Sequence, residues 1–256
     1  MGHCNICGNF GKLTEDHTPP KGCIKIKQVE LHHILMHLDV EQPSHKGRIS
    51  QNGVKFRTLC GKCNNDYLGI NYDPSFISFV NQIGLFLKTT ISIPGYMKAK
   101  IKPQRVMRSL LGHISAQGVG RYHQGAASNE IQSYFLNEEE SLPERIKIYF
   151  WAYPYKSHVM ARDCVLTDLT VGEPVAFWLL KFFPISFMVT FNEPDKYNFN
   201  MEALSKFGKL GIDDEVEVNV DLENIIHQMW PEAPTDKSVV MYGNDAIASY
   251  DWRYKS

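Results

Sequence analysis

The chain has 256 residues, of which 43% are hydrophobic and 21% charged, and this composition excludes a disordered chain and is ordinary for a globular protein. Its formal net charge is −1, but residues 1–110 hold 15 lysines and arginines against 7 acidic residues, whereas residues 111–256 carry a net charge of −9. A basic amino-terminal part suits a polyanion such as nucleic acid, although the same segregation of charge can arise by chance.

The sequence shows no targeting signal. The first five residues are polar and lack the apolar stretch of a secretory signal. The most apolar segment, 175–191, contains Lys181 and Pro184 and is short for a membrane span, so we expect a pair of buried strands there. These observations predict a cytoplasmic protein with no membrane partner.

Four of the six cysteines form two Cys-x-x-Cys pairs, Cys4 with Cys7 and Cys60 with Cys63. This spacing lets two thiolates in one tight turn reach the same ion, and two such turns complete the tetrahedral geometry of a structural Zn²⁺ site. A disulfide framework is disfavoured without a secretion signal, and a redox pair would not explain the second turn. We therefore expect Zn²⁺ bound by all four thiolates, with no ligand position open for catalysis.

The residues around the two cysteine pairs follow a known order. Residues 14–21 read Thr-Glu-Asp-His-Thr-Pro-Pro-Lys, and Asn64 and Asn65 follow the second pair directly. An acidic residue and a histidine thus stand before proline between the two Cys-x-x-Cys pairs, and asparagine follows the second pair. This order resembles the HNH endonuclease family in its zinc-ribbon form. The resemblance covers residues 1–73. Taken alone, the Asp-His pair would be read as a turn and the asparagines as a helix cap.

The resemblance implies a ββα-metal fold, in which two paired strands and a helix hold one catalytic cation. It also implies hydrolysis of phosphodiester bonds, with DNA favoured, and with His17 as the general base that deprotonates water. Asp16 would supply an oxygen ligand to Mg²⁺ or Mn²⁺. Asn64 would supply another, although the choice between Asn64 and Asn65 stays open. Effectors of bacterial restriction and anti-phage defence are similar to such a chain.

The segment between His17 and Cys60 is long for this family, since the two residues are 43 positions apart. We therefore expect an insertion before the second cysteine pair. Within this segment Asn52 and Gly53 form an Asn-Gly dipeptide, which predicts a hairpin turn.

Apolar residues at helical spacing predict a helix that begins at Asp73-Pro74 and a second one after Pro103, with Gly118 beyond its end. Basic residues surround the second helix and follow His17, and they are candidates for contacts with a nucleic-acid backbone, although a run of charges can equally be a solvated surface. These candidates are Lys21, Lys25, Lys98, Lys100, Arg105 and Arg108.

Beyond about residue 140 the pattern changes to aromatic-rich strands. We expect strands at 146–153, 158–167, 175–180, 185–191 and 216–220, and a helix at 221–230. The predicted fold class is α+β, with an HNH module and its zinc site at 1–92 and a mainly antiparallel-sheet domain at 93–256. The second domain shows no catalytic motif, and we expect it to bind a protein partner or to sense a trigger.

These features favour a metal-dependent endonuclease. The alternative is a non-catalytic zinc ribbon that binds nucleic acid or a protein, but a ribbon of that kind has no need of Asp16 and His17. A site with one catalytic metal cuts one strand, so double-strand cleavage would indicate a homodimer or two binding events.

Overall fold

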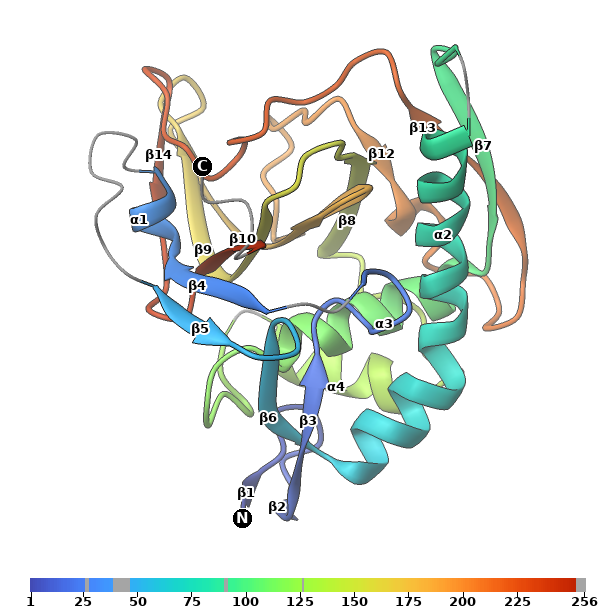
Figure 1. Cartoon of the computed structure of the whole chain (residues 1–256), viewed down its shortest axis with the longest axis vertical. Helices are drawn as coiled ribbons and strands as arrows, with labels where there is room; N and C mark the ends of the chain where they lie inside the picture. The colour runs from blue at the N-terminus through green and yellow to red at the C-terminus, as the bar shows by residue number, and fades with distance from the viewer. Residues whose placement is uncertain (26–27, 39–46, 90–91, 126, 252–256) are drawn as a thin grey trace.

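The computed structural model describes residues 1–25, 28–38, 47–89, 92–125 and 127–251. In this part of the chain, a nine-stranded antiparallel sheet is accompanied by three two-stranded sheets and four α-helices (Figure 1). The predicted α+β class with a large antiparallel sheet is confirmed. No helix in the described residues has the length and apolar character needed to cross a membrane.

The large sheet has the strand order β12, β8, β11, β10, β9, β15, β4 and β5, and β14 also pairs with β9. The strands are β4 (Val29–His33), β5 (Arg48–Ser50), β8 (Ile146–Ala152), β9 (His158–Asp168), β10 (Pro174–Phe182), β11 (Ile185–Phe191), β12 (Glu202–Ala203), β14 (Ser238–Met241) and β15 (Ile247–Asp251). The four strands predicted between residues 146 and 191 are therefore confirmed. The apolar segment 175–191 forms β10 and β11, and every residue of β11 is buried.

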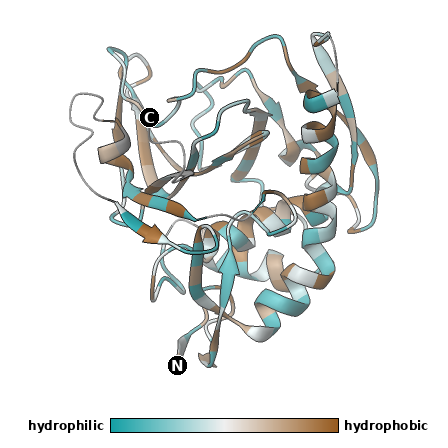
Figure 2. Ribbon diagram, in the orientation of Figure 1, coloured by the Kyte–Doolittle hydropathy of each residue, from teal (hydrophilic) through white to brown (hydrophobic). Residues whose placement is uncertain are grey.

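The helices are α1 (Ile34–Leu38), α2 (Asp73–Thr89), α3 (Pro103–Ser115) and α4 (Ser128–Leu136). Three of these four, α2 to α4, pack against one face of the sheet, whereas Ile34 of α1 packs into the apolar cluster on the other face. Along α2, hydrophobic residues recur between hydrophilic ones (Figure 2). The buried Phe76 and Phe79 of this helix contact Phe187 of β11. The predicted helix after Pro103 is α3, and Gly118 beyond it has a φ of 82°, a backbone conformation that favours glycine.

Loops cover the other face of the sheet. Trp151 of β8 packs against Trp230, and Tyr149 packs against Phe199. The helix predicted at 221–230 is wrong, because this segment forms bends and turns. The carboxylate of Asp221 accepts hydrogen bonds from the backbone N–H groups of residues 223 and 224, and such side-chain bonds compete with helix formation.

The amino-terminal residues and the rest of the chain share one sheet. Strand β4 pairs with β15, so the segment between His17 and Cys60 extends the large sheet. The Asn52-Gly53 dipeptide forms the predicted turn, with φ values of 63° and 78°. However, the strands that flank this turn do not pair with each other, since β5 pairs with β4 and β6 (Lys55–Cys60) pairs with β3. The division of roles at residue 92 stays a prediction.

A separate ribbon lies beside α2. It consists of β7 (Tyr96–Ile101) and β13 (Val216–Asp221), which pair in antiparallel fashion along the helix (Figure 1). The strand predicted at 216–220 is therefore confirmed. Its partner lies more than one hundred residues earlier in the sequence, so only the folded chain shows that it belongs outside the large sheet.

Candidate functional site

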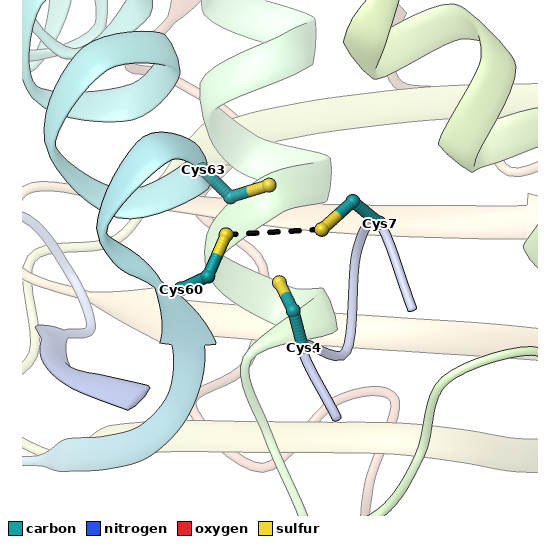
Figure 3. Close-up of side chains that lie close together, drawn as sticks. All are labelled: Cys4, Cys7, Cys60 and Cys63. Carbon is teal, nitrogen blue, oxygen red and sulfur yellow. Dashed lines mark hydrogen bonds between the residues drawn. The ribbon is translucent and has the colours of Figure 1, made fainter. Parts of the chain in front are cut away.

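The four cysteines of the two Cys-x-x-Cys pairs lie together (Figure 3), and their sulfur atoms are all within 4.8 Å of one another. Cys4 and Cys7 come from the loop between β1 (Gly2–His3) and β2 (Phe10–Gly11), and Cys60 and Cys63 come from the junction of β6 with the following helix. The Sγ atoms of Cys7 and Cys60 are 3.7 Å apart. Four cysteines in this arrangement could bind a metal ion such as zinc.

The thiols of this cluster cannot all ionise without a cation. The hydrogen bond with Cys63 lowers the pKa of Cys4 to about 5, whereas the same bond, together with burial, raises the pKa of Cys63 far above its usual range. Burial and the neighbouring thiols raise the pKa of Cys7 to about 11. A divalent cation displaces such protons and neutralises the repulsion between thiolates.

Two paired strands and a helix adjoin this cluster. Strand β3 (Leu13–His17) pairs with β6, with His17 opposite Lys55, and the prolines Pro19 and Pro20 lie just beyond its end. After Cys60 the chain forms the π-helix η1 (Lys62–Tyr72), which continues without a break into α2. The α-helix α2 begins at Asp73 as predicted, but the preceding residues are themselves helical, because η1 runs directly into it. The backbone N–H of Asp73 bonds to the carbonyl of Leu68 in the wider turn of the π-helix.

His17 is half-buried at the end of β3. Its imidazole makes no side-chain hydrogen bond to the residues that the structure describes, so both ring nitrogens are available to a substrate or water. Burial, followed by the positive charge of Lys21, lowers the pKa of His17 below its usual value of 6.5. The side chain is therefore mainly neutral at pH 7 and has a lone pair that can accept a proton.

Asn64 ties the start of the helix to the strand that ends in His17. Its Nδ2 donates to Oγ1 of Thr14 at 2.9 Å and to the backbone carbonyl of Glu15 at 3.0 Å. Its Oδ1 accepts no hydrogen bond from the described part of the chain. Asn65 is exposed and makes no such contact with β3. Of the two asparagines, Asn64 is thus the one that the fold brings to β3.

Asp16 points into the interior and joins a buried network. Its Oδ2 lies 2.9 Å from Nδ1 of His113 and accepts a hydrogen bond from the Thr18 hydroxyl at 3.2 Å. On the other side of the ring, Nε2 of His113 lies 2.9 Å from Oδ1 of Asp73, which also accepts the hydroxyl of Ser109 at 2.7 Å. Asp16 is therefore only 2% exposed, whereas a ligand of a catalytic metal is expected to be accessible to the substrate.

Both ring nitrogens of His113 face carboxylates, which accept hydrogen bonds but cannot donate them when ionised. Burial alone would lower the pKa of His113, but attraction to Asp16 and Asp73 outweighs burial and raises the pKa to about 10. No sequence pattern connects His113 with Asp16, because the two residues lie 97 positions apart. The available signal was the spacing of Ser109 and His113, two polar residues that are four positions apart and therefore share one side of α3.

Arg108 is fully buried, so the prediction that it contacts nucleic acid is wrong. Its guanidinium lies 3.9 Å from the ring centroid of Tyr134 and donates to Oε1 of Gln104. It also donates to backbone carbonyls that follow α4, those of residues 137, 138 and 140. These bonds satisfy the charge inside the protein and hold the end of α4 against α3.

The other basic residues of this run are paired with acidic residues that precede or belong to β13. Nζ of Lys98 is 2.7 Å from Glu217, and Nζ of Lys100 is 4.0 Å from Glu215. Arg105 binds both carboxylate oxygens of Asp213. The acidic residues between positions 213 and 217 thus compensate the positive charge that suggested a nucleic-acid contact here, and that contact stays a prediction.

Basic side chains also lie beside His17. Lys21 and Lys25 are exposed, as expected of candidate phosphate contacts. Lys55 and Arg57 on β6 were not singled out from the sequence, yet both reach the carboxylate of Glu15, at 3.1 Å and 2.8 Å. Because Lys55 lies directly opposite His17 in the strand register, the exposed surface around His17 is basic.

Comparisons with known proteins add no relative. No family model, no curated protein and no solved structure matches the chain. The features that bear on function are therefore those of the site itself: the four cysteines, the β3–β6 pair, His17 and Asn64.

Proposed function

We propose that this chain is a metal-dependent endonuclease of the HNH type, which hydrolyses phosphodiester bonds with His17 as its general base. The observation that carries the proposal is the pair of hydrogen bonds from Asn64 to β3. They bring an amide from the first turn of a helix to the strand that ends in His17. The cysteine cluster adjoins both elements, and a Zn²⁺ ion bound there would hold them together without taking part in the reaction.

The groups present suit the chemistry of this reaction. A neutral His17 can take a proton from the attacking water. Oδ1 of Asp16 and Oδ1 of Asn64 are hard oxygen donors of the kind that Mg²⁺ and Mn²⁺ prefer, and such ions are commonly held by one or two protein carboxylates together with substrate phosphates. A divalent cation there would neutralise charge on the phosphate and on the departing 3′ oxygen.

Lys55, with Lys21 and Lys25, is proposed to contact the phosphates of the substrate, which we infer to be DNA. The logarithm of the DNA-binding constant falls as the logarithm of the salt concentration rises, and each phosphate contact that is lost should make the slope of this dependence shallower by about 0.9 for duplex DNA. We therefore expect Lys55→Ala to lower this slope by about that amount. Lys196→Ala is the matched control and should leave the slope unchanged, because Lys196, like Lys55, is paired with a glutamate but lies in the loop after β11, outside the β3–β6 pair. Fluorescence anisotropy with labelled duplex between low and physiological salt measures both slopes.

The direct test of the proposal is a plasmid cleavage assay. Purified protein with Mn²⁺ or Mg²⁺ is expected to convert supercoiled DNA to the nicked form, and EDTA should abolish the conversion. Accumulation of linear product with protein concentration would indicate two chains acting together, whereas single nicks indicate one site. The absence of metal-dependent cleavage of DNA and RNA alike would overturn the proposal.

A non-catalytic zinc ribbon is the second candidate, and the burial of Asp16 is the observation that favours it. In that case the basic surface around His17 would bind nucleic acid without cutting it. Such a protein, stripped of metal with EDTA and then reloaded with Zn²⁺ alone, would still bind DNA. It would cut DNA under no metal condition.

A further inference from the structure

The buried network at Asp16 joins three elements that lie far apart in the sequence. Asp16 belongs to β3, Asp73 to the beginning of α2, and His113 to the last turn of α3. His113 bridges the two carboxylates with one ring nitrogen each, at 2.9 Å on both sides. The hydroxyl of Thr18 donates a further hydrogen bond to Asp16, and that of Ser109 donates one to Asp73. Each of these bonds goes to the same carboxylate oxygen that His113 approaches.

This arrangement uses one oxygen of Asp16 twice and leaves the other unused. Oδ2 receives both His113 and Thr18, while Oδ1 accepts no hydrogen bond from the residues described in the structure. The ring of His113 cannot rotate freely, because it is 1% exposed and its far nitrogen is held by Asp73. The carboxylate plane of Asp16 is consequently fixed by an element outside the β3–β6 pair.

We infer that His113, held by Asp73, is the positioning residue of the nuclease site: it orients Asp16 so that Oδ1 alone is left for the divalent cation. The inference rests on the proposed function, since it requires a cation at Asp16. Carboxylates that ligate metals are themselves usually hydrogen-bonded, and loss of such a partner weakens metal binding. A network that only tied β3 to the helices would stabilise the fold without affecting the metal.

Two substitutions of His113 separate these roles. The amide nitrogen of asparagine reaches about as far as Nδ1 of histidine, and that of glutamine about as far as Nε2. His113→Asn therefore keeps the bond to Asp16 and loses Asp73, whereas His113→Gln keeps Asp73 and loses Asp16. Both variants are neutral and both lose one of the two bonds, so a purely structural role predicts similar losses of stability and no difference in metal binding.

The probe is Mn²⁺ alone, titrated into the zinc-loaded full chain and followed by electron paramagnetic resonance, with the Mn²⁺ dependence of cleavage measured in parallel. His113→Gln should weaken Mn²⁺ binding on the order of 10–100-fold, the range usual for partners of metal ligands. His113→Asn should bind Mn²⁺ nearly as the wild type does. Asp16→Asn in the same titration shows how much of the binding depends on Asp16.

Equal Mn²⁺ affinity in the two His113 variants, with binding that still depends on Asp16, would overturn the inference and leave the proposed nuclease intact. Wild-type protein whose Mn²⁺ binding is unchanged by Asp16→Asn would overturn both the cation assignment and the inference. If either His113 variant fails to fold, Thr18→Val and Ser109→Ala form a milder pair. Each removes one hydrogen bond, and only Thr18→Val should weaken Mn²⁺ binding.

Discussion

Replacing His17 with alanine is expected to reduce the rate of cleavage by about 10²–10⁴-fold, the usual contribution of a general base. The imidazole makes no side-chain hydrogen bond to the described residues and is only half-buried, so little stability is lost with it. The unfolding midpoint and the zinc content should therefore stay at wild-type values. Single-turnover cleavage at saturating Mn²⁺, together with thermal unfolding, measures both expectations.

The control for this experiment is His227→Ala. His227 is an exposed histidine in the segment that follows β13, on loops that cover the sheet rather than on the β3–β6 pair. Its removal should leave the cleavage rate unchanged. A His17→Ala protein that cuts at the wild-type rate would show that another group activates the water.

Loss of the metal at the cysteine cluster is expected to unfold the amino-terminal part of the chain. The apolar side chains around the cluster are few, chiefly Ile6, Leu59, Leu68, Tyr72 and Phe135. Closing the 53-position loop between Cys7 and Cys60 costs about 3–4 kcal/mol of chain entropy. A structural zinc site in a small domain supplies roughly 10–16 kcal/mol of apparent binding free energy, which is as large as the entire stability of many domains.

Cys60→Ser tests this expectation, with the bound zinc measured after exhaustive dialysis and the unfolding followed by circular dichroism. The variant should lose zinc and unfold at a much lower temperature, and its cleavage activity should disappear as well. Cys164→Ala is the matched control, because Cys164 lies buried in β9, in the apolar cluster with Trp151 and Phe177, and is not one of the four clustered cysteines. Wild-type protein that contains no zinc, or a Cys60→Ser variant with an unchanged unfolding midpoint, would contradict the metal's role.

The sequence by itself determined the features that depend on neighbouring residues. The strands from Ile146 to Phe191 and the helix after Pro103 were predicted because side-chain periodicity is set by the local backbone, two residues in a strand and 3.6 in a helix. The Cys-x-x-Cys turns were recognisable for the same reason, since two thiols of one turn point to one ion.

Only the tertiary structure decided which distant residues meet. Arg108 looked like a surface cation, but in the folded chain the carbonyls after α4 surround its guanidinium and make burial of the charge tolerable. The segment 221–230 has helical spacing, yet its backbone turns instead, because the N–H groups of residues 223 and 224 donate to the carboxylate of Asp221. The contact between Asp16 and His113 forms because α3 packs against β3. The two residues lie 97 positions apart, so no local pattern encodes their contact.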